Sequence, residues 1–174
     1  MRVYKLVEKR NDGTYHPLYV NRDTEFVLGE KYLPTEAPED FIHGIRKVKS
    51  ALGFLSWRPG IHCCEFPLAD HIGVKQADGT LAQRPNNVWL ECEFDLPDIT
   101  DRAMEQGRNK RGKVIPVKAC FRELQYGYYW YQTTPKAKVR WVICSEITPI
   151  REVPNEEVAE ICRANGFEPQ KLAV

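Results

Sequence analysis

The chain has 174 residues, and its 25 basic and 24 acidic side chains leave a formal net charge of +1. A net charge this close to zero does not by itself indicate nucleic acid or a membrane surface as a partner, so only local clusters of charge can indicate one. The sequence contains no apolar run long enough to span a membrane and no signal-peptide pattern near its start, which predicts a cytoplasmic protein without membrane contact. Its length predicts a single domain over residues 1–174.

The cysteines indicate buried thiols rather than disulfides or a metal site. Six cysteines are spread through apolar segments, and no C-x-x-C pair occurs among them. Cys63 and Cys64 are adjacent, so on a strand they would point to opposite faces and could not ligate one ion together. We therefore expect no bound metal.

The first half of the chain is predicted to contain a β-hairpin, a loop and one helix. Asn11-Asp12-Gly13 between two β-rich runs predicts a hairpin at the start of the chain. Residues 21–40 are rich in charge, glycine and proline and predict a loop. A helix that ends before Gly53 is predicted by apolar residues at helical spacing, namely Phe41, Ile45, Val48 and Leu52.

The second half adds strands and two helices. Apolar patterns predict strands over residues 87–94, 114–124, 126–133 and 139–147. In the last of these, Trp141, Ile143 and Ile147 would share one face. One helix begins near residue 99, and a C-terminal helix is predicted over residues 155–165, with Asn155 as its N-cap. The predicted fold is α+β, mainly an antiparallel sheet with a few helices.

The segment Arg58-Pro59-Gly60-x-His62 is the strongest candidate for a site. Gly60 permits a turn that lets Arg58 and His62 face one cleft. Arginine offers a planar fork to phosphate, and histidine exchanges a proton near neutral pH. The alternative is that Arg58 pairs with an acid such as Glu65 or Asp70, and that His62 is a core residue.

The chain after His62 would complete an anion pocket. Pro67 suits the first position of a helical turn that ends at Ile72 and carries His71. A helix N-terminus beside an arginine and a histidine attracts anions. Gly60 and His71 are therefore expected to contribute to ligand binding together with Arg58.

A basic loop followed by an aromatic run is a second candidate. Single-stranded RNA is often held by a basic groove and by aromatic faces on which bases stack. The expected ligand-binding residues are Arg108, Lys110, Arg111, Lys113, Tyr128 and Trp130. The alternative is that the aromatic run packs in the core and under a loop.

Tyr129 lies on the other face of this run. With His62 moving protons, Arg58 neutralising phosphate charge and Tyr129 assisting, the three would form the catalytic residues of a metal-independent ribonuclease. Glu91 and Glu93 share a strand face and offer acid/base chemistry, although a solvated strand face is the simpler interpretation.

The sequence resembles a set of uncharacterised proteins encoded by phages and prophages of Firmicutes. The resemblance rests on R-P-G-[WI]-H at Arg58–His62 and P-x-A-x-H-[IL] at Pro67–Ile72, and on segments at Val88–Glu93 and Trp141–Ile150. Ile61 stands where tryptophan is usual in that set. The resemblance implies a phage or prophage origin. A phage accessory protein that binds RNA or a nucleotide would suit counter-defence, for example of the anti-CRISPR type.

A second resemblance is to the core of ADP-ribosyltransferases, through a strand followed by a P-x-A turn and a late aromatic turn before a buried strand. It implies NAD as the cofactor, whereas no cofactor is expected otherwise. The chain departs from that pattern, because Gly127, Tyr128 and Tyr129 stand where a supporting glutamate is usual.

Three functions follow as hypotheses. The first is a phage protein that binds RNA or a nucleotide and cleaves it, with a host ribonucleoprotein as one such partner. The second is an ADP-ribosyltransferase-like enzyme that uses NAD. The third is a non-catalytic binder that inhibits a host defence protein through its aromatic and basic surface.

Overall fold

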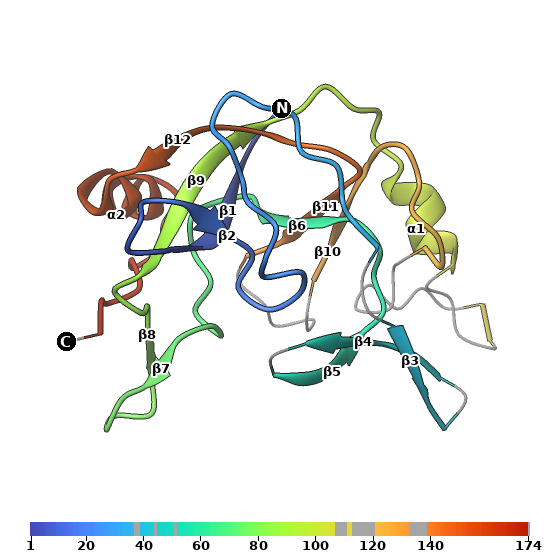
Figure 1. The fold of residues 1–174 in the computed structure, drawn as a ribbon, viewed down its shortest axis with the longest axis horizontal. Coiled ribbons are helices and arrows are strands. Elements are labelled where there is room, and N and C mark those ends of the chain that lie inside the picture. The colour runs from blue at the N-terminus through green and yellow to red at the C-terminus, as the bar shows by residue number, and fades with distance from the viewer. Residues whose placement is uncertain are drawn as a thin grey trace.

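The computed structural model describes residues 1–36, 39–43, 45–50, 52–106, 111–112, 121–132 and 139–173. Its centre is an antiparallel sheet in the order β10-β11-β6-β1-β9-β12, with β2 paired to β1 (Figure 1). The strands are β1 (Arg2–Lys9), β2 (Tyr15–His16), β6 (Ile61–Cys64), β9 (Asn87–Glu93), β10 (Tyr128–Tyr131), β11 (Trp141–Cys144) and β12 (Thr148–Val153). The described part of the chain has two helices beside this sheet, α1 (Thr100–Gln106) and α2 (Asn155–Ala164), which confirms the α+β class.

The predicted opening hairpin is confirmed. β1 pairs with β2, and Gly13 turns the chain between them with a φ of +87°. The Asp12 carboxylate fixes the turn by accepting hydrogen bonds from the Thr14 backbone N–H at 3.0 Å and the Thr14 hydroxyl at 2.6 Å. Such side-chain bonds to a nearby backbone group are the reason that Asp and Gly favour turns.

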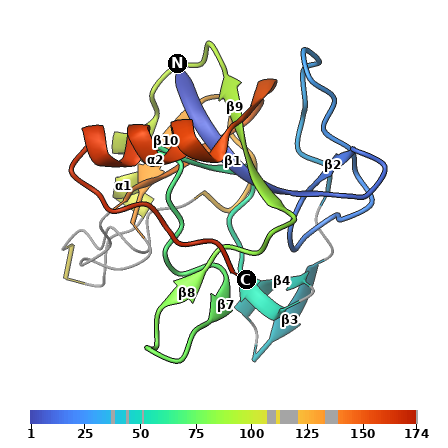
Figure 2. The ribbon, with the colours of Figure 1, turned by 90° about the vertical axis from the view of Figure 1, so that its left-hand side faces the viewer.

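The main sheet is covered on both faces, and each face has its own core. On one face, Val3, Val7 and Leu90 pack with Phe26 from the loop after β2. On the other face, Leu6 and Trp89 pack against α2 through Val158 and Cys162. Figure 2 shows α2 on one side of β1 and β9, and β2 with its following loop on the other. β9 alternates as predicted, with Val88, Leu90 and Cys92 in the first core and Trp89 in the second.

The helix predicted from Asp40 to Leu52 is wrong. The chain instead forms a three-stranded sheet from β3 (Glu39–Ile42), β4 (Ile45–Ser50) and β5 (Gly53–Ser56). Val48 is buried, whereas Phe41 and Leu52 are exposed, so no apolar helical stripe is buried here. The positive φ angles at His43 (51°) and Gly53 (93°) turn the chain at both ends of β4.

The predicted helical turn from Pro67 to Ile72 is also absent. These residues form bends and one turn, closed by the Ile72 N–H donating to the Ala69 carbonyl at 2.8 Å. Leu68 and Ala69 are buried in the core under α2, and the Pro67 carbonyl accepts a hydrogen bond from the Cys162 thiol. The segment therefore fills the core and presents no helix N-terminus to an anion.

The strand predicted over residues 139–147 is shorter in the structure. β11 ends at Cys144. At the next position the Ser145 N–H still donates to the Gly127 carbonyl, but the Gly127 N–H donates to the Ser145 hydroxyl, both at 3.1 Å. Ile147 consequently packs in the first core, on the face opposite Trp141, and does not share a face with it as predicted. Residues 114–120 of another predicted strand lie outside the described residues.

The C-terminal helix is confirmed, with one correction. α2 starts at Asn155, and Pro154 takes the N-cap position, so Asn155 is the first helical residue and no side chain caps the helix. Glu156 and Glu157 lie in the first turn, as expected from the helix dipole. After α2 the chain passes beside the hairpin of β7 (Val74–Lys75) and β8 (Leu81–Ala82), where Gln83 exchanges backbone hydrogen bonds with Lys171 and Ala173.

Neither helix of the described residues is long and apolar enough to cross a membrane.

Candidate functional site

Three neighbouring strands bring the candidate residues together. β11 lies between β10 and β6, and its register aligns Tyr129 with Ile143 and His62 in one row across the sheet. Two positions along the strands, another row aligns Tyr131 with Trp141 and Cys64. Residues directly opposite each other share a face, and so do residues two positions apart on one strand. His62, Tyr131 and Trp141 therefore all project from the same side.

These side chains form a compact group, which we call the Trp141 cluster: Arg58, His62, His71, Tyr131 and Trp141. The rings of Tyr131 and Trp141 are stacked, with centroids 6.3 Å apart and 16° between their planes. The His62 ring meets Tyr131 at 6.1 Å and Trp141 at 6.2 Å, both edge to face. The His71 ring meets Trp141 at 5.4 Å in the same manner. Trp141 is thus the centre of the cluster.

Arg58 supplies the positive charge of this cluster. Its guanidinium carbon lies 4.9 Å from the centre of the Tyr131 ring. Glu65, one of the acids considered as its partner, instead accepts two hydrogen bonds from Arg140, at 3.2 and 2.8 Å. Asp70, the other, lies 3.7 Å from Nδ1 of His71. Arg58 therefore packs on an aromatic ring while these two carboxylates face other side chains.

Gly60 allows this arrangement. Its φ is +122°, and a Cβ atom there would lie 2.5 Å from Cγ2 of Ile143 and 3.2 Å from the Cys144 carbonyl oxygen. The chain between Arg58 and β6 consequently passes directly against β11. The prediction of a glycine turn that brings Arg58 and His62 to one side agrees with this geometry.

His62 is neutral at physiological pH in this environment. Burial, and then the nearby charges of Lys5 and Arg58, lower the pKa of its imidazole to about 3. The Lys5 ammonium group is close because it donates to the His62 backbone carbonyl at 3.0 Å. A ring with this pKa does not serve as a proton donor near neutral pH.

Tyr129 lies in the same row as His62 but two strands away, or about 10 Å between backbones. It is 3% exposed and packs with Phe121, whose ring centre is 5.4 Å from its own. Sequence reasoning selected Tyr129 and missed Tyr131 and Trp141, although all three lie on the face that alternation assigns to odd-numbered residues of this region.

Tyr128 and Trp130 lie on the opposite face of the sheet. Both pack against the core that contains Phe94, and the Tyr128 ring is 5.1 Å from the Phe94 ring. Burial and the neighbouring Asp98 raise the pKa of Tyr128. Arg140 covers Trp130, with its guanidinium carbon 4.1 Å from the ring centre. The sheet therefore divides the predicted binding residues into two groups that cannot meet one ligand together.

Most of the predicted basic loop lies outside the described residues. Arg108, Lys110 and Lys113 lie outside the described residues, and Arg111 is exposed. The expected role of these four side chains in nucleic-acid binding stays a prediction.

Two further carboxylates of interest are engaged elsewhere. Glu91 is buried and forms ion pairs at 2.5 Å with both Arg2 and Arg151, so it does not lie on a solvated strand face, whereas Glu93 is exposed. Glu146 pairs with Lys31 at 2.7 Å. Within the described ranges, no group of three or more His, Cys, Asp or Glu side chains is placed to hold a metal ion.

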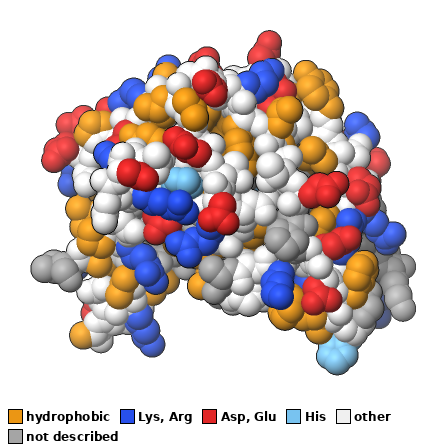
Figure 3. Space-filling view, viewed as in Figure 1, with side chains coloured by type: hydrophobic (Ala, Val, Ile, Leu, Met, Phe, Trp, Pro, Cys, Tyr) orange, Lys and Arg blue, Asp and Glu red, His pale blue; other side chains and the backbone are white. Residues whose placement is uncertain are grey.

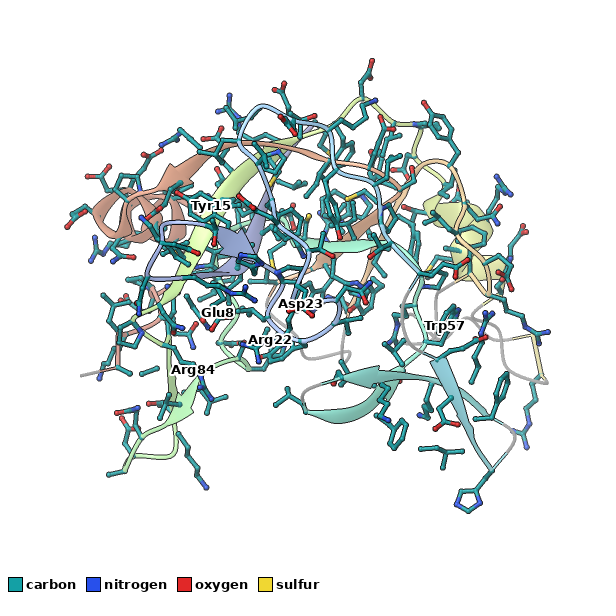
Figure 4. The ribbon with its side chains drawn as sticks, in the orientation of Figure 1. Glu8, Tyr15, Arg22, Asp23, Trp57 and Arg84 are labelled. Atoms are coloured by element: carbon teal, nitrogen blue, oxygen red, sulfur yellow. The ribbon has the colours of Figure 1, made fainter. Side chains whose placement is uncertain are left out.

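The face shown in Figure 3 carries interspersed basic and acidic side chains around its centre. Figure 4 places Glu8, Arg22 and Asp23 close together there, below β1 and β2, with Arg84 beside them. Glu8 and Arg22 form an ion pair at 2.8 Å, which also lowers the pKa of Glu8. The charges of this face largely compensate each other, so the Trp141 cluster remains the better candidate.

Comparison with family models, with curated proteins and with solved structures gave no match for this chain.

Proposed function

We propose that the protein binds a nucleotide or a single-stranded segment of RNA at the Trp141 cluster. The observation that carries this proposal is the placement of an arginine against a stack of two aromatic rings, beside two imidazoles. Proteins that bind unpaired bases combine aromatic faces for stacking with cations for the backbone.

Each part of the ligand has a matching group in the cluster. Trp141 is half-buried and His71 is exposed, so both present ring surface on which a base can stack. Arg58 is half-buried beside them, and a guanidinium group binds phosphate oxygens through paired hydrogen bonds. A base and its phosphate thus find complementary groups on one face of β6 and β11.

The geometry supports binding better than cleavage. A ribonuclease that depends on His62 needs an imidazole that exchanges protons near neutral pH. The lowered pKa of His62 opposes this role and favours a neutral ring that packs under the ligand. Cleavage by His62 with Arg58 and Tyr129 stays a prediction, to be tested together with binding.

The ADP-ribosyltransferase-like alternative has less support. It needs a carboxylate beside the ribose of NAD. Glu91 lies three strands from Trp141, or about 14 Å across the sheet, and Asp70, beside His71, is exposed to solvent. That the ligand belongs to a host defence complex, and that the protein acts in phage counter-defence, is a proposal that rests on the sequence resemblance alone.

The test is binding of a short fluorescein-labelled single-stranded RNA, measured by fluorescence anisotropy. We expect Arg58→Gln and Trp141→Ala to weaken binding about tenfold each, because stacking of one base contributes about 1–3 kcal/mol. Arg140→Gln is the matched control, since Arg140 also covers an aromatic ring but on the other face.

Equal affinities of the Arg58→Gln and Arg140→Gln proteins would overturn the proposal. The same RNA, incubated in EDTA and run on a gel, reports cleavage, and a parallel incubation with NAD reports its turnover. Loss of RNA cleavage in His62→Asn would restore the nuclease hypothesis, and NAD turnover would favour the transferase.

A further inference from the structure

The sheet of β3, β4 and β5 has one edge that is open to another strand. Figure 1 shows this sheet below the main sheet. β4 is the central strand, and β5 pairs with β4 alone in the described part of the chain. All four residues of β5 are exposed. An exposed edge strand offers a row of backbone N–H and C=O groups to any extended chain.

The register shows which groups point outward. Two residues separate Ser50 from Gly53, and these two face each other across the hairpin of β4 and β5. In a two-residue hairpin this closing pair is hydrogen-bonded, so Gly53 and Leu55 direct their backbone groups toward β4. The N–H and C=O groups of Phe54 and Ser56 therefore point away from the sheet.

The opposite edge, formed by β3, is less open. The same alternation directs the backbone groups of Phe41 outward, but its N–H donates to the Asp40 carboxylate at 2.7 Å. β3 is also acidic, with Glu39 paired to Arg46. An incoming strand consequently finds available donors at β5 and an occupied donor at β3.

The charges near β5 favour an acidic partner. Lys47 and Lys49 alternate along β4 and share a face with Ser56 and Phe54, which lie directly opposite them. Neither ammonium group has a carboxylate within ion-pair distance among the described residues. Alternate side chains of a strand added beside β5 would project on this face, where carboxylates reach toward the two lysines.

Apolar contacts complete the surface. Phe54 is 46% exposed and Leu52, at the tip of the hairpin, is 64% exposed. From these observations we propose that the free edge of β5 binds an extended, acidic peptide segment of a partner protein by strand addition. Backbone hydrogen bonds to Phe54 and Ser56 provide the pairing, and Lys47 and Lys49 select acidic side chains.

A designed octapeptide of alternating threonine and glutamate tests this proposal by NMR titration of the labelled protein. We expect the amide protons of Phe54 and Ser56 to shift, and those of Gly53 and Leu55 to change little. Ser56→Pro removes one outward donor without touching the bonds to β4, and proline is tolerated on edge strands. We expect it to weaken binding up to about tenfold, as the loss of one backbone hydrogen bond would do, while Ser56→Ala binds as the parent.

Charge is tested separately. Lys47→Glu with Lys49→Glu should abolish binding of the acidic peptide, whereas Lys75→Glu, on the distant β7–β8 hairpin, should leave it unchanged. The proposal is overturned if millimolar peptide leaves the β5 amides unshifted, or if Ser56→Pro binds as tightly as Ser56→Ala. It is equally overturned if the lysines bind single-stranded RNA in place of the peptide, or if light scattering shows a dimer that Ser56→Pro dissociates.

Discussion

Tyr131 and Trp141 face each other across β10 and β11, and their rings are stacked with 16° between the planes. The pair joins two cores, because Tyr131 packs with the residues around Tyr129 while Trp141 also borders the core under α2. Arg58 and the two histidines collect around this pair. The same contacts that support the proposed ligand site therefore also stabilise one end of the main sheet.

Trp141→Ala should lower the free energy of unfolding by about 2–4 kcal/mol, because it removes the contacts of Trp141 with Tyr131, His62 and His71. Trp141→Phe retains a ring against Tyr131 and should cost about 1 kcal/mol. Urea unfolding followed by far-UV circular dichroism measures both values. Equal midpoints for the alanine variant and the parent would show that the cluster does not support the sheet.

His62 should make the stability depend on pH. Its pKa in the folded chain is about 3, against 6.5 ordinarily, so between these values the unfolded chain holds a proton that the folded chain lacks. Protonation of His62 therefore does not lower the free energy of unfolding above about pH 6.5. As the pH falls from 6.5 toward 3, the free energy of unfolding falls by at most about 1.4 kcal/mol per pH unit. Urea midpoints between pH 7 and pH 5 should fall more steeply for the parent than for His62→Asn. Parallel slopes would contradict the lowered pKa.

Gly60→Ala should destabilise the protein more than Gly79→Ala. Both glycines have a positive φ, but a Cβ at Gly79 meets nothing within 4 Å, whereas one at Gly60 would collide with buried Ile143. We expect a cost of about 1–2 kcal/mol at Gly79 from the backbone alone and about 3 kcal/mol or more at Gly60. Thermal unfolding of the two variants measures the difference. Similar losses would mean that β11 moves away from Gly60 without cost.

Arg151→Gln should lower the urea midpoint more than Arg2→Gln. Both arginines pair with buried Glu91, but Arg151 also holds Glu157 in the first turn of α2. Removal of Arg151 therefore detaches the first turn of α2 and also leaves the buried Glu91 carboxylate with one ion-pair partner fewer. In a double-mutant cycle with Glu91→Gln, we expect a coupling of about 1 kcal/mol. Additive effects would show that Arg151 and Glu91 are independent in solution.

The parts of the site that depend on neighbouring residues could be predicted from the sequence. Arg58, Gly60 and His62 lie within one turn and one short strand, so local chemistry is enough to place them together. Trp141 could not be placed in this way, because its contact with His62 depends on the pairing of β6 with β11. Alternation likewise puts Tyr129 and Tyr131 on one face, but it does not show that the ring of Tyr131 stacks on Trp141 beside His62, which depends on the pairing of β10 with β11.

The helix wrongly predicted from Asp40 to Leu52 has a similar origin. Four apolar residues at helical spacing also fit a sheet in which Val48 is buried and Lys47 and Lys49 flank it, and the turns at His43 and Gly53 decide between the two. The helical turn predicted from Pro67 to Ile72 is wrong for another reason. Leu68 and Ala69 bury their side chains under α2, and this packing prevails over the preference of proline for a helix start.

β1 holds the centre of the main sheet, and its partners β6 and β9 are synthesised much later than β1 itself. β1 can pair along both of its edges only when those distant strands have been made, and Leu6 is covered only when α2 follows them. A sheet assembled around such a strand has a high contact order, because its paired residues are far apart in the sequence. Large loops must close before these strands can pair. Folding is consequently expected to be slow, and a chain interrupted before β9 would leave β1 open to aggregation.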